Sequence, residues 1–173
     1  MSTLKILASA AVVLGGGYIG LLLASTLDIR VRQLEQFRLA IEQMGFSISF
    51  LKLPVAEALC GAAKSRSGAV GRILSGAASE ISENRLSPAV ALERSVQRNR
   101  SSLCVGEEEL DILSEFAASL GRGDAESELS NINAACARLK IAQAAAEGER
   151  DQKGRMWRGI GLLCGMFAVV MLF

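Results

Sequence analysis

The stretch Leu120-Gly121-Arg122-Gly123-Asp124 decides how this chain folds, because it ends one helix and starts another. Gly121 can adopt the left-handed conformation that closes a helix without a Cβ clash. Asp124 then stands at the N-cap position, where its carboxylate can accept hydrogen bonds from the open amides of the next turn. The stretch predicts a sharp reversal between an apolar helix ending at Leu120 and a long helix after Asp124.

Apolar side chains after this reversal recur at alternating steps of three and four residues, which indicates one buried face of a helix. The same spacing occurs near the start of the chain. We expect the two stripes to pack against each other in antiparallel helices. The first stripe comprises Leu34, Phe37, Ile41, Met44, Ile48 and Leu51, and the second comprises Leu129, Ile132, Cys136, Leu139, Gln143 and Ala146.

Between the two stripes, turn signals divide the chain into shorter helices. Leu53-Pro54 and Ser87-Pro88 each place a proline at a helix start, and residues 64–68 form a polar turn. Patterns typical of strands are nearly absent. The sequence therefore predicts an all-α domain, a small bundle of about six helices.

Two uncharged segments at the ends account for the 50% apolar composition and the mean hydropathy of +0.32. Residues 6–27 would form a helix of about 33 Å, enough to cross a bilayer. Residues 159–173 would form only about 22 Å, and they span only if residues 156–158 act as an interfacial collar. A half-inserted anchor is the alternative for this second segment.

We expect three parts: an N-terminal transmembrane helix (1–27), a soluble helical bundle (28–155) and a C-terminal transmembrane helix (156–173). Arginine and lysine residues lie just inside both apolar segments, which places the bundle in the cytoplasm by the positive-inside rule. A cleaved signal peptide is the competing interpretation of the start. The apolar core is long for a signal peptide, and the helical pattern continues past Arg30, so we favour an uncleaved anchor.

Charge and reactive side chains exclude several function classes. Residues 28–158 hold 18 of the 19 basic residues and all 18 acidic ones, so nucleic-acid binding is not expected. The chain has no histidine, the commonest general base, and it has neither a phosphate-binding glycine loop nor a Gly-x-Ser-x-Gly motif. We expect no enzyme activity, no cofactor and no small-molecule substrate.

The cysteines Cys60, Cys104, Cys136 and Cys164 are isolated in sequence. Without a CxxC pair or a histidine they predict no metal site. In a reducing cytoplasm disulfides are rare, so we expect each to be a small buried apolar residue.

Two kinds of candidate contact site remain. Charged residues on two edges of the domain form a possible partner-docking surface, although the acidic ones also suit the first turn of a helix. Small residues in the apolar segments form a possible membrane helix contact, although glycine is common in such helices. The docking candidates are Arg94, Arg98, Arg100, Glu107, Glu108 and Glu109, and the helix-contact candidates are Gly16, Gly20, Gly161 and Gly165.

Several motifs along the chain match one known family. They are Tyr18-Ile19-Gly20, the Arg30 to Leu34 pattern, Leu53 to Leu59, Leu120-Gly121-x-x-Asp124, and Arg155-Met156-Trp157-Arg158 before Gly161 and Gly165. On these motifs the chain resembles the stage III sporulation protein AB family of endospore-forming bacteria over nearly its full length. It departs from the family pattern at Glu128, in place of a glutamine, and at Ala117, in place of a glycine.

The resemblance implies a non-enzymatic platform or scaffold subunit of the sporulation channel between mother cell and forespore. The soluble domain would be similar to the type II secretion inner-membrane platform protein. The implied partners are a cytoplasmic ATPase of the same sporulation complex and other channel membrane subunits. The implied location is the cell membrane on the mother-cell side, the outer forespore membrane. From the residues alone, a stand-alone membrane-anchored helical adaptor unrelated to secretion stays open.

Overall fold

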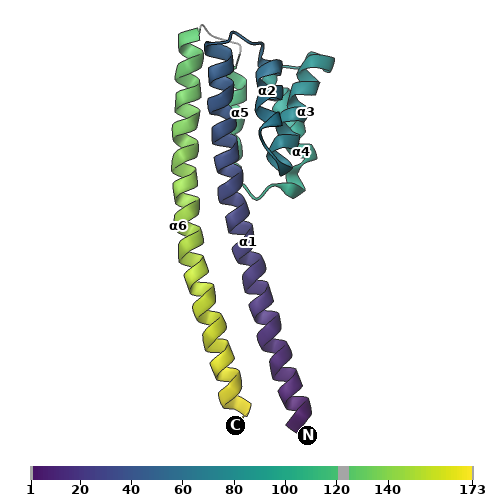
Figure 1. Ribbon diagram of the computed structural model, residues 1–173, viewed down its shortest axis with the longest axis vertical. Helices are drawn as coiled ribbons and strands as arrows, with labels where there is room; N and C mark the ends of the chain where they lie inside the picture. The colour runs from purple at the N-terminus through teal and green to yellow at the C-terminus, as the bar shows by residue number, and fades with distance from the viewer. Residues whose placement is uncertain (1, 121–124, 173) are drawn as a thin grey trace. The chain divides into compact units, whose positions relative to one another are not determined.

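The computed structural model describes the backbone of residues 2–120 and 125–172, and the side chains of residues 25–120, 126–153 and 156. Within these residues there are six α-helices and no strand, which confirms the all-α prediction (Figure 1). The elements in order are α1 (Ser2–Ser49), α2 (Val55–Lys64), α3 (Gly68–Asn84), α4 (Pro88–Arg98), the 3-10 helix η1 (Arg100–Ser102), α5 (Glu107–Ser119) and α6 (Ala125–Leu172).

The chain divides into two compact units, Arg30–Ala144 and the pair of end segments Met1–Ile29 with Ala145–Phe173. The first unit contains α2 to α5 and the inner parts of α1 and α6. In the second unit, Arg150 Nη1 lies 3.8 Å from Asp28 Oδ1, so an ion pair joins the two end segments.

The core of the unit Arg30–Ala144 is built on the two predicted stripes. On α1, Leu34, Phe37, Ile41 and Met44 are buried, and on α6 Leu139 has no exposed surface. The helices run antiparallel, because Gly45 lies against Ile132 while Arg38, earlier in α1, contacts Cys136, later in α6. The predicted packing of the two stripes is confirmed.

The stripes are shorter than predicted at the end where α1 stops. Leu51 is 55% exposed because it lies beyond the last helical residue, Ser49. Leu129 is 39% exposed. With Ile132 opposite Gly45, Leu129 lies one turn nearer the end of α1, where few residues remain to cover it.

The inner helices begin where the prolines predict. α2 begins directly after Pro54, and α4 begins at Pro88 with Ser87 in extended conformation at the N-cap. The Ser87 side chain makes no capping bond, and its carbonyl accepts from Ala91 N–H at 3.0 Å instead. Fixed proline dihedrals, rather than side-chain caps, therefore mark these helix starts.

The remaining predictions fall on residues that are not described. Gly121, Gly123 and Asp124 of the reversal lie outside the described residues, although α5 ends at Ser119 and α6 begins at Ala125 as the reversal requires. Among the described residues no helix is long and apolar enough to cross a membrane. The apolar segments 6–27 and 159–173, with Gly16, Gly20, Gly161, Gly165 and Cys164, lie almost entirely outside the residues whose side chains are described.

Candidate partner-docking surfaces

Arg94 and Arg98 of α4 converge on a single carboxylate, that of Glu80 in α3. Arg98 Nη1 lies 2.6 Å from Glu80 Oε1, and Arg94 Nη1 lies 4.0 Å from Oε2. The Glu80 side chain is 6% exposed, whereas those of Arg94 and Arg98 are 55% and 64% exposed. The two predicted docking residues are therefore exposed cations held over a buried anion.

Glu80 is ionised at neutral pH because its neighbours favour the charged form. The hydrogen bond from Asn84 Nδ2, at 2.8 Å, is the largest cause that lowers the pKa of Glu80. Burial opposes this effect, and the hydrogen bond and charge of Arg98 and the charge of Arg94 lower the pKa further. Because the anion is buried, removing both arginines would leave a charge without compensation inside the α3–α4 pair.

Arg100 and Glu107 form an ion pair with each other next to the start of α5. Arg100 also donates from Nη1 to the Val105 carbonyl at 3.2 Å, which fixes the end of the loop before α5. The pair is exposed, since 80% of the Glu107 side chain is accessible. These two predicted docking residues thus neutralise each other, at least in part.

Glu109 is one of the docking candidates from the sequence, but its side chain is only 5% exposed. It therefore adds no exposed charge to a docking surface. It forms an ion pair with Arg30 of α1, whose Nε lies 3.1 Å from Oε1. A Cβ at Gly106 would come within 2.5 Å of Glu109 Oε2, so a glycine before α5 makes room for this carboxylate. Glu109 therefore fastens α5 to α1.

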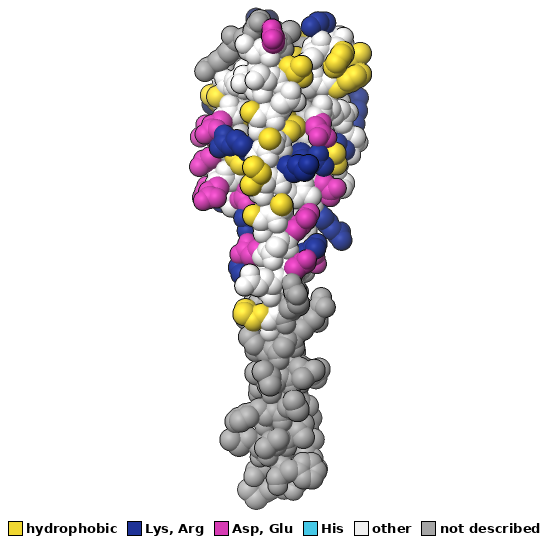
Figure 2. Space-filling model, turned by 90° about the vertical axis from the view of Figure 1, so that its left-hand side faces the viewer, with side chains coloured by type: hydrophobic (Ala, Val, Ile, Leu, Met, Phe, Trp, Pro, Cys, Tyr) yellow, Lys and Arg dark blue, Asp and Glu magenta, His cyan; other side chains and the backbone are white. Residues whose placement is uncertain are grey.

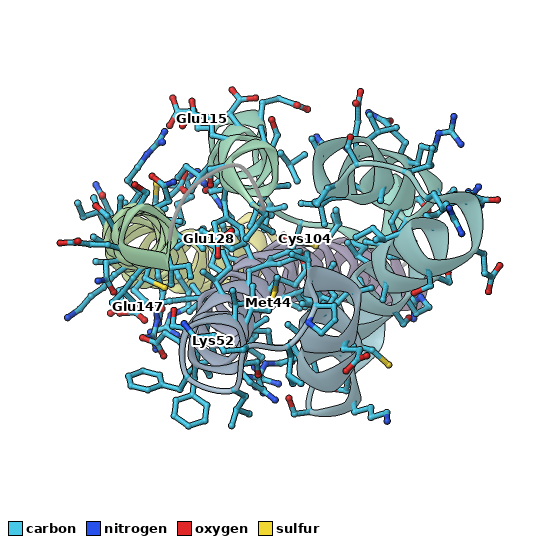
Figure 3. The ribbon with its side chains drawn as sticks, turned by 90° about the horizontal axis from the view of Figure 1, so that it is seen from above. Met44, Lys52, Cys104, Glu115, Glu128 and Glu147 are labelled. Atoms are coloured by element: carbon cyan, nitrogen blue, oxygen red, sulfur yellow. The ribbon has the colours of Figure 1, made fainter. Side chains whose placement is uncertain are left out.

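Exposed carboxylates continue along the outer side of α5. Glu108 and Asp111 are exposed, and Glu115 forms an ion pair with Arg138 of α6. Seen from above, α5 lies with α6 on one side and the α3–α4 pair on the other, and Glu115 projects from its outer face (Figure 3). We call Glu108 and Asp111 the acidic edge, and Arg94 and Arg98 the basic edge.

Sequence reasoning missed a polar clamp at Gln33. This residue lies off the apolar stripe, yet it is 7% exposed. Its Nε2 donates to the Ser102 carbonyl at 2.9 Å, and its Oε1 accepts from Cys104 N–H at 2.8 Å. Gln33 stands four, seven and eleven residues before the buried Phe37, Ala40 and Met44, so helical spacing places it near the buried face. No local pattern predicts its partners, because they are backbone groups about seventy residues away.

Large apolar side chains are exposed on two helices. Phe46 on α1 stacks with Phe50, the first residue after the helix, with ring centroids 5.2 Å apart, and the two side chains are 56% and 71% exposed. On α6, Ile141 is 71% exposed. Figure 2, which looks onto α6, shows apolar side chains along its outer face with charged side chains on both sides.

A small apolar cavity lies inside the described bundle. It measures about 20 Å³, room for about one water molecule. Every lining residue is apolar, including Phe37, Met44 and Phe116. Among the described residues, no three metal-ligating side chains gather in one place.

The three cysteines that the structure describes are less buried than we expected. Cys60 is exposed on α2, so it is not the buried apolar residue that we expected, whereas Cys104 and Cys136 are half-buried. Burial, with a smaller effect of the Glu42 charge, raises the pKa of Cys136 to about 11 against the opposing charge of Arg38. No disulfide links the cysteines that are described.

Comparison with known proteins gives one consistent result. The family model described as "Stage III sporulation protein AB (spore_III_AB)" matches residues 5–173. The stage III sporulation protein AB of Bacillus subtilis (strain 168) is 25% identical over 169 residues, which cover 98% of this chain and 99% of the relative. A solved structure titled "Stage III sporulation protein AB (SpoIIIAB)" superposes with a TM-score of 0.67 and 25% identity, covering 72% of this chain and 98% of that one.

Proposed function

Because the chain belongs to the stage III sporulation protein AB family, we propose that it is a non-enzymatic platform subunit of the sporulation channel between mother cell and forespore. Both ends of the chain are anchored in the membrane. The bundle between them contacts a cytoplasmic ATPase and other membrane subunits of the channel. The protein lies in the outer forespore membrane, with the bundle in the mother-cell cytoplasm.

The observation that carries this proposal is the continuity of α1. Its backbone is helical from Ser2 to Ser49, so the uncharged segment 6–27 and the buried stripe of the bundle lie on one helix without an intervening loop. α6 shares this feature, from Ala125 to Leu172. A domain whose first and last core helices continue into apolar segments is suited to hold partners at a membrane.

The non-enzymatic role is supported by how the polar residues are used. The ion pairs Arg30–Glu109 and Arg98–Glu80, and the Gln33 clamp, join one helix or loop to another. These groups bond to one another or to the backbone and stabilise the bundle, whereas catalytic groups face a cleft that admits substrate. Arg94, Arg98 and Arg100, with Glu107 and Glu108, remain as surfaces for partner contact.

Membrane topology is the first test. In a variant without the native cysteines, single cysteines replace Ser65 and Ser127, two exposed positions of the bundle. A membrane-impermeant maleimide should label neither position in intact cells and both after permeabilisation. A cysteine at Thr3, outside the cytoplasm in this proposal, is the matched control and should label in intact cells. Labelling of Ser65→Cys and Ser127→Cys from outside would exclude contact with a cytoplasmic ATPase.

Co-purification distinguishes the platform from a stand-alone adaptor. The full chain, extracted from sporulating cells in mild detergent, should retain the ATPase of the sporulation complex. A chain that carries the same tag but only residues 1–29 is the control for adhesion to the membrane fraction. If the two retain equal amounts of ATPase, the adaptor becomes the better explanation.

A further inference from the structure

We propose that neighbouring copies of this chain pack head to tail, with the basic edge of one bundle against the acidic edge of the next. The contact joins Arg94 and Arg98 on α4 to Glu108 and Asp111 on α5 of another copy. The inference rests on the proposed function, in which these edges are docking surfaces, and it identifies one partner as a second copy of the chain.

Within the part of the bundle that the structure describes, the acidic edge has no counter-ion. Glu108 and Asp111 are exposed on α5 and lie one helical turn apart. Among the described residues neither forms an ion pair, whereas their neighbours Glu107 and Glu115 pair with Arg100 and Arg138. In Figure 2 acidic side chains lie on both sides of the bundle, with the denser group along the left-hand edge. Two carboxylates therefore remain for a cationic partner.

The basic edge carries an excess of positive charge. Two guanidinium groups share one carboxylate, that of Glu80, and both side chains are more than half exposed. Arg72 of α3 adds a third cation nearby. Its Nε donates to Oδ1 of Asn99 at 3.3 Å, and Asn99 directly follows Arg98 in the sequence. Arg94 and Arg98 are also one turn apart, so their spacing matches that of the acidic edge.

Pairing between copies follows because the edges do not neutralise each other within one bundle. Arg94 and Arg98 contact α3, although α4 also packs against α5. A contact between two different edges of identical chains is heterologous, so it repeats from copy to copy into a ring or an arc. Exposed ion pairs contribute little individually. Confinement in a membrane raises the effective concentration of neighbours and compensates for this weakness.

Cysteine cross-linking tests the geometry with the full chain in liposomes. In a variant without native cysteines, one population carries Gln97→Cys on α4 and another carries Ser114→Cys on α5; both positions are exposed. Cross-links should form in the mixture and not within either population alone. Raising the salt concentration to about 1 M should reduce them about tenfold by screening. Cross-links within one population, or insensitivity to salt, would overturn the proposal.

An exchange of charges tests the pairing itself. The first variant carries Arg94→Glu and Arg98→Glu together with Glu80→Gln. The change at Glu80 removes the buried carboxylate, which would otherwise repel the two new glutamates. The second carries Glu108→Arg and Asp111→Arg. When both the Gln97→Cys and the Ser114→Cys populations carry the same charge variant, cross-linking should fall about tenfold below that of the parent. The mixture should recover it, because the reversed α4 of one variant meets the reversed α5 of the other.

Controls separate this inference from the proposed function. Glu80→Gln alone should cross-link like the parent, and circular dichroism confirms that each variant is folded. If the variant with Glu108→Arg and Asp111→Arg does not fold, Glu108→Gln with Asp111→Asn replaces it. This neutral variant should also reduce cross-linking, because it removes the attraction without adding repulsion. Failure of the mixture to recover overturns head-to-tail packing. The liposomes contain no ATPase, so cross-linking tests head-to-tail packing alone. If cross-linking persists while the co-purification of the ATPase fails, only the proposed function is overturned.

Discussion

Gly45 of α1 lies so close to Ile132 of α6 that a Cβ at position 45 would come within 2.8 Å of Ile132 Cγ2. Ile132 is 3% exposed and branched at Cβ, so it cannot easily move aside. The absence of a side chain at Gly45 therefore sets how closely these two helices approach.

Replacing Gly45 with valine should destabilise the bundle by about 2 kcal/mol, because overpacking outweighs the better helix propensity. The measurement is thermal unfolding of the full chain in mild detergent, followed by circular dichroism. Gly61→Ala on α2 is the matched control, since nothing lies within 4 Å of its Cβ. It should stabilise the chain by about 1 kcal/mol. Equal effects of the two changes would show that the helices are not in close contact.

Replacing Gln33 with leucine should destabilise the bundle by about 1–3 kcal/mol. The change leaves the Ser102 carbonyl and the Cys104 amide without their partner. Gln36→Leu, one turn further on, should change the free energy of unfolding by less than about 0.5 kcal/mol. Hydrogen exchange gives a second readout: amide protons near Cys104 should exchange faster in the Gln33 variant only.

Glu80 should make the free energy of unfolding depend on pH in the acidic range. Its pKa in the folded chain is lowered from the usual 4.5, chiefly by the Asn84 hydrogen bond. The stabilisation is therefore fully present above the unfolded value and is lost as pH falls through the folded value. Unfolding temperatures of the parent and of Glu80→Gln should differ at pH 7 and converge only once the pH falls below the folded pKa of Glu80, which is itself below 4.5. A difference that is constant with pH contradicts this role of Glu80.

Cys136 should react slowly with thiol reagents. With a pKa of about 11, about one thiol in a thousand is ionised at pH 8. Cys60, which is exposed, should be labelled at least about tenfold faster, as mass spectrometry of the modified peptides would show. Raising the pH to 10 should accelerate labelling of Cys136 in the folded chain. Equal rates for both thiols at pH 8 would mean that Cys136 is accessible.

Repetitive, local signals made most of the fold predictable. The spacing of Leu34, Phe37 and Ile41 specifies a helix face because each turn repeats the same requirement. Pro54 and Pro88 mark helix starts because ring geometry, and not a distant partner, fixes their backbone. The six-helix all-α bundle follows from such signals alone.

The candidate site was less predictable because its polar contacts join distant parts of the chain. Glu109 stands three, four and seven residues before Ile112, Leu113 and Phe116, so helical spacing places it on the buried face of α5. Its partner Arg30 lies 79 residues earlier, and no local pattern predicts that contact.

Glu80 likewise stands seven residues after Ile73 and three after Ala77, on the buried face of α3. Its partners Arg94 and Arg98 lie on another helix, and no local pattern predicts that contact. A sequence pattern identifies charged residues, whereas the tertiary fold decides which of them pair.

The packing of α1 against α6 has a consequence for the order of folding. The Cys136–Arg38 contact joins residues 98 positions apart, whereas α2 to α5 pack against their neighbours in sequence. Closing so long a loop is slow compared with forming local hairpins. During synthesis α2 to α5 can therefore assemble beside α1 while the face that will receive Ile132 and Leu139 is still uncovered. The bundle is completed only when the last helix leaves the ribosome, and until then that apolar face needs protection from aggregation.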